Sequence, residues 1–297
     1  TVGNLWVWTE RTTWNPLGGF SDVYSQDIWR NINDPPIWNH PFSGIPIPFR
    51  SSFSVETKGG EHTIEVPTSA VRLDPFTDTW IPVAKGTKAT SKVTFDYSKY
   101  FQSKWHHGVP ISMADVVYSI FQNFDIAFDP DKAVIETSIA MTSKPFLETF
   151  KGFRVLDENR LEVYVDYWHF EESYIASYAN PTSLSTPWEI LYAMDMVVFQ
   201  DRQGAYSDTT ASQFNVPWLS LVMGRDARLI RNQLTKLNQQ NTNLSKVFSI
   251  NGFNLSSNKS QKARFIAGLD WWEKYGMLVI GNGPFQLTRF DPPAQFA

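Results

Sequence analysis

The sequence of 297 residues contains no cysteine. This absence excludes disulfide bonds, cysteine-ligated zinc, iron–sulfur clusters and thiol nucleophiles, but it does not fix the cellular compartment. A basic excess is also missing, because 26 lysines and arginines face 30 aspartates and glutamates, giving a formal net charge of -4. A general phosphate-binding surface needs such an excess, so nucleic acid is not expected as a partner. No apolar run approaches the length that spans a bilayer.

Aromatic residues are what the sequence has in excess. Phe, Trp and Tyr make up 15% of the chain, and 12 of them are tryptophans. Hydrophobic residues amount to 42% and charged residues to 19%, which is typical of a globular chain with a substantial core. Most of the rings are expected in that core. Tryptophans in this number also suit surfaces that stack on sugars or grip peptides.

Helices are predicted where capping residues precede an apolar periodicity. Ser112 and Asp115 form a capping-box pattern before residues whose apolar face repeats at three and four positions. A second capping pattern, Thr186 to Glu189, has proline at the first helical position and predicts a helix to about residue 200. Further helices are expected over 22–32, 225–239 and 261–275, the last ended by Gly276.

Strands are predicted where apolar and β-branched residues alternate or cluster. Residues 153–156 and 161–165 flank a polar turn and predict a hairpin. Residues 34–48 hold five prolines, which excludes a regular helix and predicts an extended crossover. Other strands are expected over 5–8, 53–66, 92–101, 277–280 and 285–290.

The sequence shows no assembled catalytic constellation. His106 and His107 could contact a metal, but neighbouring imidazoles rarely converge on one ion. Glu171 and Glu172 are adjacent, whereas glycosidase carboxylates face each other across a sugar. The glycine-rich segment 281–284 lacks the Lys-Ser/Thr of a phosphate-binding loop. We therefore expect no enzyme, no metal and no cofactor.

Three N-glycosylation acceptor sequences cluster in one polar stretch, at Asn243, Asn254 and Asn258. Their number is about what chance gives for a chain with this much Asn, Ser and Thr. Their clustering suits an exposed loop of an extracellular protein.

The segment 104–120 reads Lys-Trp-His-His-Gly-Val-Pro-Ile-Ser-Met-Ala-Asp-Val-Val-Tyr-Ser-Ile. It resembles the signature of the family 5 extracellular solute-binding proteins, a His-Asp-Gly turn followed by Pro-Leu-Thr-Ala-Glu-Asp-Val-Val. These proteins are the oligopeptide- and dipeptide-binding components of ABC importers. His107 replaces the usual Asp and Ser112 the Thr, and Met113 is a further departure from the pattern.

Other segments add to the resemblance. Residues 281–287 are similar to the family's Gly-Thr-Gly-Pro-Tyr-Lys-Leu, and Asp291-Pro292 fits the acid-Pro pair that follows it. Residues 5–16 resemble the first strand with its following Asn-Pro, and residues 49–55 the segment that ends in Ser-Trp-(Glu/Lys)-Val. Residues 171–276 match no motif of the family.

The resemblance implies an α/β (mixed) fold, periplasmic-binding-protein type II-like and incomplete. Residues 1–44 and 279–297 would be parts of the first lobe. Residues 45–278 would form an inserted α+β subdomain with a helical expansion at about 171–276. In the family the second lobe follows the Gly-Thr-Gly-Pro strand, so this chain is expected to be the N-terminal part of a longer protein.

The resemblance also implies a function, an extracellular substrate-binding protein of an ABC importer. It would capture oligopeptides in a cleft between two lobes and deliver them to the permease subunits. It would be periplasmic, or held at the cell surface by a membrane anchor outside this chain. An oligosaccharide is the rival solute, because some members take sugars and this chain is rich in tryptophan. A cell-surface structural or interaction protein without transport is the third alternative.

In the family, the turn after the first strand lines the cleft. The residues of this chain expected to contact solute are therefore Thr9, Glu10, Arg11 and Trp14.

Overall fold

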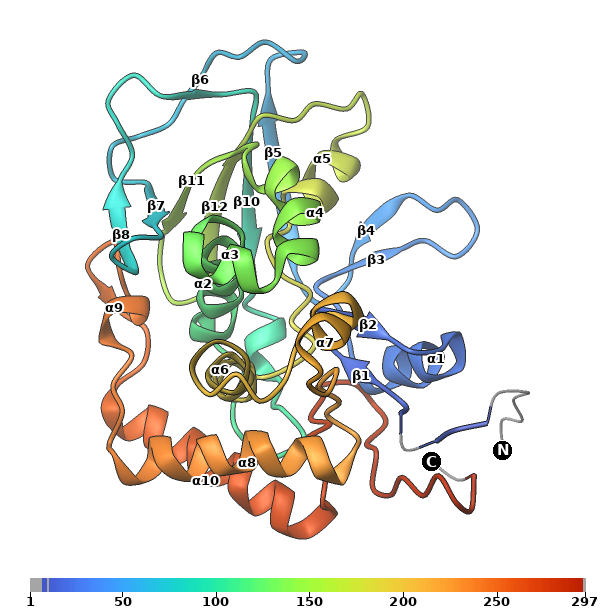
Figure 1. Ribbon diagram of the computed structural model, residues 1–297. Helices are drawn as coiled ribbons and strands as arrows, with labels where there is room; N and C mark the ends of the chain where they lie inside the picture. The colour runs from blue at the N-terminus through green and yellow to red at the C-terminus, as the bar shows by residue number, and fades with distance from the viewer. Residues whose placement is uncertain (1–6, 10, 296–297) are drawn as a thin grey trace.

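The computed structural model describes residues 7–9 and 11–295, which form a mixture of helices and strands (Figure 1). The helices are α1 (Val23–Ile32), α2 (Met113–Phe128), α3 (Pro130–Ile135), α4 (Thr137–Leu147), α5 (Glu172–Ala179), α6 (Trp188–Asp195), α7 (Asp208–Phe214), α8 (Gly224–Gln239), α9 (Ser245–Phe248) and α10 (Asn258–Tyr275). Two further helical turns are a 3-10 turn, η1 (Tyr100–Gln102), and a π-helical turn, η2 (Met196–Gln200).

The strands are short outside one central sheet. They are β1 (Trp14–Asn15), β2 (Gly19–Phe20), β3 (Ile37–Asn39), β4 (Pro46–Pro48), β5 (Ser52–Thr57), β6 (Ile64–Glu65), β7 (Val71–Asp74), β8 (Thr79–Pro82), β9 (Lys88–Ala89), β10 (Ser91–Asp96), β11 (Phe150–Val155), β12 (Arg160–Val165), β13 (Ser249–Ile250) and β14 (Phe253–Asn254).

Six of these strands form the central sheet in the order β5-β10-β12-β11-β7-β8, and each neighbouring pair is antiparallel. The pairing of β10 with β12 sets Val93 opposite Val163 and Phe95 opposite Leu161, so these side chains share one face. All four side chains are fully buried. This face supplies the sheet's part of the main hydrophobic core.

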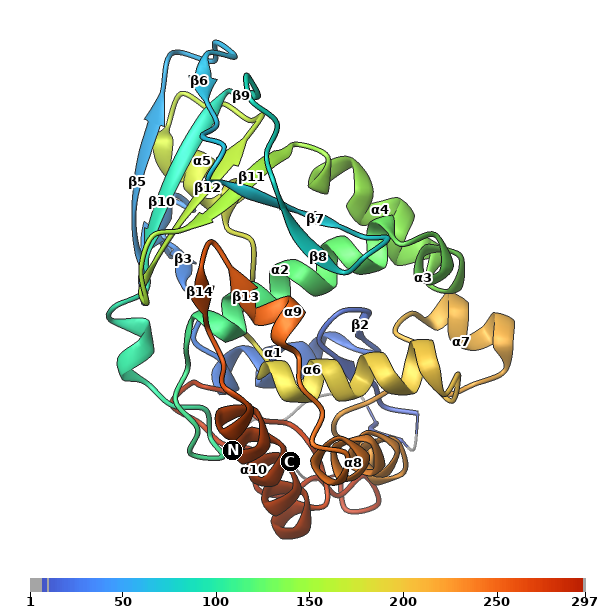
Figure 2. The same ribbon diagram turned by 90° about the vertical axis from the view of Figure 1, so that its left-hand side faces the viewer.

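Helices stack in layers below the sheet (Figure 2). Helix α2 lies nearest the sheet, α6 follows, and α8 and α10 pack side by side at the far end. One hydrophobic core runs through these layers, from Val163 in the sheet through Val117 and Ile190 to Leu234. No helix among the described residues has the length and hydrophobicity needed to cross a membrane.

Segments near the two ends of the chain lie together (Figure 1). The rings of Trp8 and Phe290 are 5.4 Å apart, and the Gly283 N–H donates to the Ile32 carbonyl at 2.7 Å. A Cβ on Gly281 would stand 2.3 Å from the same carbonyl oxygen, so only glycine permits this contact. The predicted lobe and subdomain boundaries themselves stay predictions.

The predicted helices are confirmed as α1, α2, α6, α8 and α10. The capping pattern expected at Thr186 is wrong, because Pro187 is the N-cap of α6 and not its first helical residue, and no side-chain hydrogen bond caps this helix. Asp22 caps α1 by accepting the Ser25 N–H at 2.7 Å, and the capping box of Ser112 and Asp115 opens α2. Helix α10 ends at Gly276, whose left-handed conformation (φ 67°) suits glycine. The predicted hairpin is β11–β12.

Several predicted strands are wrong or divided. Residues 277–280 and 285–290 form no strand; the first of these runs is buried, and the Leu278 N–H donates to the Leu221 carbonyl at 2.8 Å. Its apolar sequence therefore reflects burial and not sheet pairing. The expected strand 53–66 divides into β5 and β6 at Gly59 and Gly60, both at positive φ. The expected strand 92–101 ends with β10 at residue 96, and η1 follows.

Two further expectations concern the N-terminal region. Of the strand expected over 5–8, residues 5–6 lie outside the described residues, and residues 7–8 are not in a strand. Residues 34–48 form the hairpin β3–β4 instead of an extended crossover.

Candidate functional site

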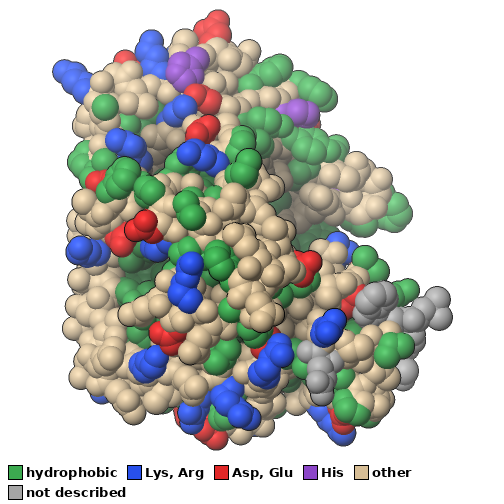
Figure 3. All heavy atoms as spheres, viewed as in Figure 1, with side chains coloured by type: hydrophobic (Ala, Val, Ile, Leu, Met, Phe, Trp, Pro, Cys, Tyr) green, Lys and Arg blue, Asp and Glu red, His purple; other side chains and the backbone are tan. Residues whose placement is uncertain are grey.

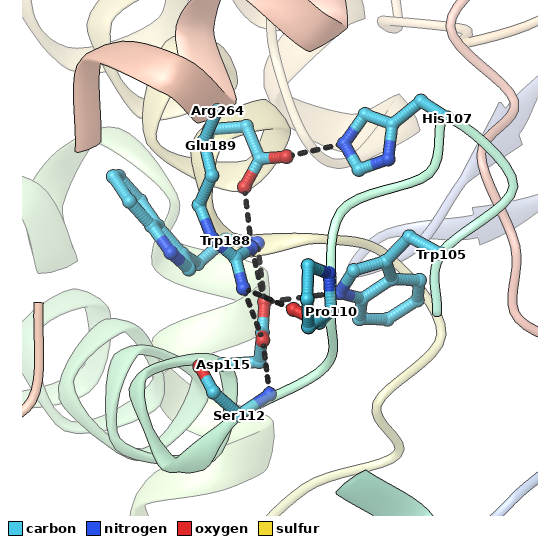
Figure 4. A network of polar contacts seen from close by, with 8 residues as sticks. All are labelled: Trp105, His107, Pro110, Ser112, Asp115, Trp188, Glu189 and Arg264. Atoms are coloured by element: carbon cyan, nitrogen blue, oxygen red, sulfur yellow. Dashed lines mark hydrogen bonds and ion pairs between the residues drawn. The ribbon is translucent and has the colours of Figure 1, made fainter. Parts of the chain in front are cut away.

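A buried ionic network joins the segment 104–120 to the helical region 171–276 (Figure 4). The guanidinium of Arg264 on α10 forms a two-bond fork with Asp115 of α2, at 2.9 and 2.8 Å. Its Nη1 also donates to Glu189 of α6 at 2.9 Å, and its Nη2 to the Pro110 carbonyl at 2.8 Å. Glu189 in turn meets His107 Nε2 at 2.6 Å. These four charged or titratable side chains are all 3% exposed or less.

The electrostatics of the network favour an ionised Glu189. Burial alone would raise the pKa of Glu189, but Arg264 and the His107 hydrogen bond outweigh it and lower the pKa to about 2. The stabilisation from this carboxylate is therefore present above its unfolded-state value of 4.5 and is lost as the pH falls through 2.

The network organises the motif that carries the family resemblance. Trp105 Nε1 and the Trp188 N–H donate to Asp115 Oδ1, each at 3.3 Å, and the Ser112 N–H donates to Oδ2 at 2.9 Å. The Arg264 guanidinium lies 5.6 Å from the Trp188 ring centre. The ionic groups of the network pair with one another away from solvent, and among the described residues His107 Nδ1 is left without a partner. The network therefore holds the motif turn in place and does not offer an open site for a solute.

A hollow with a volume of about 510 Å³ opens beside the N-terminal segment. Three segments line it: residues 11–13, residues 208–218 and the pair Arg225–Asp226. Arg11 and Asp208 are exposed and bring charges of opposite sign to its wall. The hollow can therefore offer both cationic and anionic contacts to one ligand.

Hydrogen bonds hold the N-terminal segment against residues 219–221, next to the hollow. The Trp14 N–H donates to Ser220 Oγ at 3.0 Å, and the Leu221 N–H donates to the Trp14 carbonyl at 3.0 Å. The Asn15 side-chain amide donates to the Leu219 carbonyl at 3.0 Å. These contacts fix the position from which residues 11–13 reach the hollow.

Trp218 is the aromatic residue in the lining of the hollow, and its indole is held in place. Its Nε1 donates to the Tyr206 carbonyl at 2.7 Å. A Cβ on Gly18 would stand 1.6 Å from that carbonyl oxygen and 3.2 Å from Trp218 Nε1. The close approach of the turn 15–19 to this bond therefore requires glycine at position 18.

The structure places the four predicted contact residues differently. Arg11 lines the hollow, whereas Thr9 is exposed but is not among the lining residues. Glu10 lies outside the described residues. Trp14 is fully buried, with its ring 6.2 Å from that of Trp29, and therefore belongs to the core and not to the hollow.

Sequence reasoning missed most of the lining. Asp208, Trp218 and Arg225 all come from the region 171–276, for which no motif was found. Trp218 is one of 12 tryptophans, and no spacing in the sequence separates it from those of the core.

The histidine and glutamate pairs considered for catalysis have structural partners. His106 Nε2 lies 2.9 Å from the Gly283 carbonyl, and His107 Nε2 meets Glu189, so the two imidazoles point to different partners. Glu171 is the N-cap of α5 and accepts from Ser173. Each of these contacts supports the helix or turn on which the residue lies.

Three carboxylates in the described part of the chain could approach one cation. Oxygen atoms of Asp78, Asp125 and Asp129 lie within 4.8 Å of one another. The Lys132 ammonium already occupies this cluster, at 2.5 Å from Asp125 and 3.8 Å from Asp129. The ammonium pairs with two of the three carboxylates, Asp125 of α2 and Asp129 at the start of α3, while Asp78 approaches them from the β7–β8 turn.

Asp125 is expected to make stability depend on pH. Burial raises its pKa from 3.8 to about 7, although Lys132 opposes the shift. The folded state thus holds a proton that the unfolded state releases, and stability falls as the pH rises from 3.8 through 7. Asp125→Asn removes this titration. The melting temperature of the variant minus that of wild type should therefore be larger at pH 8 than at pH 4. Asp131→Asn, at an exposed position, is the control. The same difference in melting temperature at pH 4 and pH 8 for Asp125→Asn would contradict a raised pKa of Asp125.

The three glycosylation acceptors, Asn243, Asn254 and Asn258, are exposed. They lie around α9 and the β13–β14 pair and at the first residue of α10. Their use stays a prediction.

Comparison with known families and with curated proteins adds no relative. No family matches the chain, and no curated protein is significantly similar to it.

Proposed function

We propose that this chain is part of an extracellular solute-binding protein of an ABC importer and that its solute is an oligopeptide. In this proposal the fold is of the periplasmic-binding-protein type II class, and a second lobe outside this chain closes over the solute. The role is binding and delivery to a permease, with no catalytic step. The chain would act at the cell surface or in the periplasm.

The observation that carries the proposal is the hollow beside residues 11–13. From the family resemblance we expect solute contacts in the turn that follows residues 5–8. Arg11 in this turn lines a hollow of about 510 Å³. This volume lies within the range of about 300–1,000 Å³ that is usual for small-ligand sites. The buried Thr12 and Thr13 add polar groups beside Arg11.

Charges of both signs support a peptide as the solute. Arg11 can pair with a carboxylate, and the exposed Asp208 in the same lining can pair with an amino group. A peptide carries both groups at its ends, whereas a neutral oligosaccharide carries neither. One specific observation favours the rival solute: Trp218 lines the same hollow and its indole is fixed, as stacking on a pyranose ring requires.

Replacing Arg11 with alanine is expected to weaken peptide binding about tenfold or more, because a hydrogen bond to a charged group contributes about 1.5–3 kcal/mol. The measurement is titration calorimetry with a mixed oligopeptide pool and, separately, with oligosaccharides. Arg228→Ala, an exposed arginine on α8, is the matched control.

The outcomes separate the alternatives. Peptide binding that depends on Arg11 supports the proposal. Sugar binding that depends on Trp218 would replace the peptide by an oligosaccharide. Binding of neither class by the full-length protein would overturn the transport function and favour the cell-surface interaction protein.

A further inference from the structure

The hairpin β3–β4 projects from the body of the protein, on the side of the molecule shown in Figure 1. Phe42 near its tip is 95% exposed, and Trp38, Ile45 and Phe49 are also exposed. In the space-filling view of the same side, the projection ends in hydrophobic side chains (Figure 3). Exposed aromatic and aliphatic side chains gathered on one projecting element are typical of a surface that meets a partner.

The hairpin carries no Asp, Glu, Lys or Arg. Residues 35–49 contain 15 positions without any of these four residue types, between Asp34 and Arg50. The nearest charges stand at its base, where Arg50 Nε bonds Asp34 at 2.8 Å and Lys99 Nζ donates to the Phe49 carbonyl at 3.0 Å. The element thus consists of a tip without Asp, Glu, Lys or Arg, with the Arg50–Asp34 ion pair and the cationic Lys99 behind it.

The backbone donors at the tip are satisfied within the hairpin. The N–H groups of Phe42 and Ser43 donate to His40 Nδ1 at 3.4 and 3.2 Å, and that of Gly44 to the His40 carbonyl at 2.8 Å. The His40 N–H donates to the Ile45 carbonyl at 2.9 Å, and the Ile45 N–H to Ser43 Oγ at 3.3 Å.

The remaining two positions of the tip, Pro41 and Pro46, have no N–H group. Each position from 40 to 46 therefore has its backbone donor either paired or absent, whereas the carbonyl groups of residues 41–44 accept no hydrogen bond from the described residues and are left to water or to lipid head groups. A loop in water needs no such arrangement, because water satisfies its donors. A segment that leaves water for a less polar medium does need it.

The base of the hairpin is fixed to the body. The Ser51 N–H and hydroxyl both donate to the Pro36 carbonyl, at 3.0 and 3.1 Å, and the Tyr100 hydroxyl donates to the Asp34 carbonyl at 2.7 Å. The tip is thus presented on a rigid support, so its aromatic groups lose little conformational freedom on contact with a partner.

We propose that the β3–β4 tip inserts into the interfacial layer of a lipid membrane. Phe42 and Ile45 enter the apolar boundary, and Trp38 lies at the level of the head groups, where tryptophan is enriched. Lys99 behind the tip faces the lipid phosphates. This contact is separate from solute binding in the hollow, and it adds a second attachment to any anchor outside this chain.

Lipid fits the hairpin better than a protein partner does. A protein interface usually offers and requires directional hydrogen bonds around its apolar centre. The backbone N–H groups of the tip are hydrogen-bonded within the hairpin, and the tip has no charged side chain. Both features suit a medium without fixed hydrogen-bond acceptors. A protein partner is instead an outcome of the test below.

The test is flotation of the full protein with vesicles of phosphatidylcholine alone and of equal parts phosphatidylcholine and phosphatidylglycerol. Wild type is expected to float with both, more with the anionic mixture. Phe42→Asp should lower the partition coefficient about tenfold or more, because it removes a large apolar group and adds a charge. Phe76→Asp is the matched control, since Phe76 is also exposed (79%) but lies on the β7–β8 turn.

Because Phe42 makes almost no contact with the body, its variant is expected to keep the wild-type melting temperature. Failure of wild type to float with either vesicle would overturn the proposal and leave a protein partner for the tip. Binding that persists in Phe42→Asp, or that Phe76→Asp weakens equally, would also overturn it, because both results indicate adsorption through another surface.

Discussion

Replacing Arg264 with leucine is expected to lower the free energy of unfolding by about 3–5 kcal/mol. The guanidinium makes four hydrogen bonds, to Asp115, Glu189 and the Pro110 carbonyl, and all of them lie inside the protein. Without it, two buried carboxylates lose their cation and repel each other. The chain responds by protonating them or by opening the contact between α10 and the motif turn.

Denaturant unfolding of Arg264→Leu beside Lys262→Leu measures this effect. Lys262 is on the same helix but exposed, so its replacement should change stability by less than about 0.5 kcal/mol. The double variant Asp115→Asn with Glu189→Gln, added to Arg264→Leu, should recover part of the loss because the unpaired charges are gone. Equal stability of the two single variants would show that the network does not hold these layers together.

Replacing Gly18 with alanine is the second change with a large expected effect, about 3 kcal/mol. The new methyl group would stand 1.6 Å from the Tyr206 carbonyl oxygen, which is a backbone atom and cannot turn away. The turn 15–19 or the chain at Tyr206 must move. Either movement disturbs the hydrogen bond from Trp218 and with it the wall of the hollow.

Gly224→Ala is the matched control. Gly224 begins α8, and a Cβ there would meet its nearest neighbour at an ordinary 3.7 Å. Its thermal unfolding should equal or exceed that of wild type, because alanine favours a helix. A Gly18→Ala variant that melts like wild type would contradict the close approach of the two segments.

Local signals in the sequence predicted local structure well. The Ser112–Asp115 pair and Gly276 each act on backbone groups a few residues away, so their meaning can be read without the rest of the chain. The apolar run 277–280 was misread because burial and strand pairing produce the same composition.

Partners distant in the sequence could not be predicted. Arg264 reaches Asp115 across 149 positions, and nothing near either residue marks the other. A buried arginine on a helix also reads as a surface residue, because charged side chains are seldom buried without a partner. The role of residues 171–276 in supporting the motif therefore became visible only in the structure.

Of the described residues that were expected to contact solute, Arg11 alone is among those that line the hollow, and its contact with a solute stays a prediction. The resemblance led to the turn after residue 8, and Arg11 lines the hollow there. The sequence does not show that Trp14 is buried whereas Trp218 lines the hollow, because the exposure of a ring depends on packing across the whole chain.

The most direct test of solute binding is hydrogen–deuterium exchange of the full-length protein with and without a saturating oligopeptide pool. We expect slower exchange in peptides that cover residues 11–18 and 205–218, with little change in the hairpin 37–48. Unchanged exchange in both of these segments, or protection confined to another part of the molecule, would contradict the assignment of the hollow as the solute site.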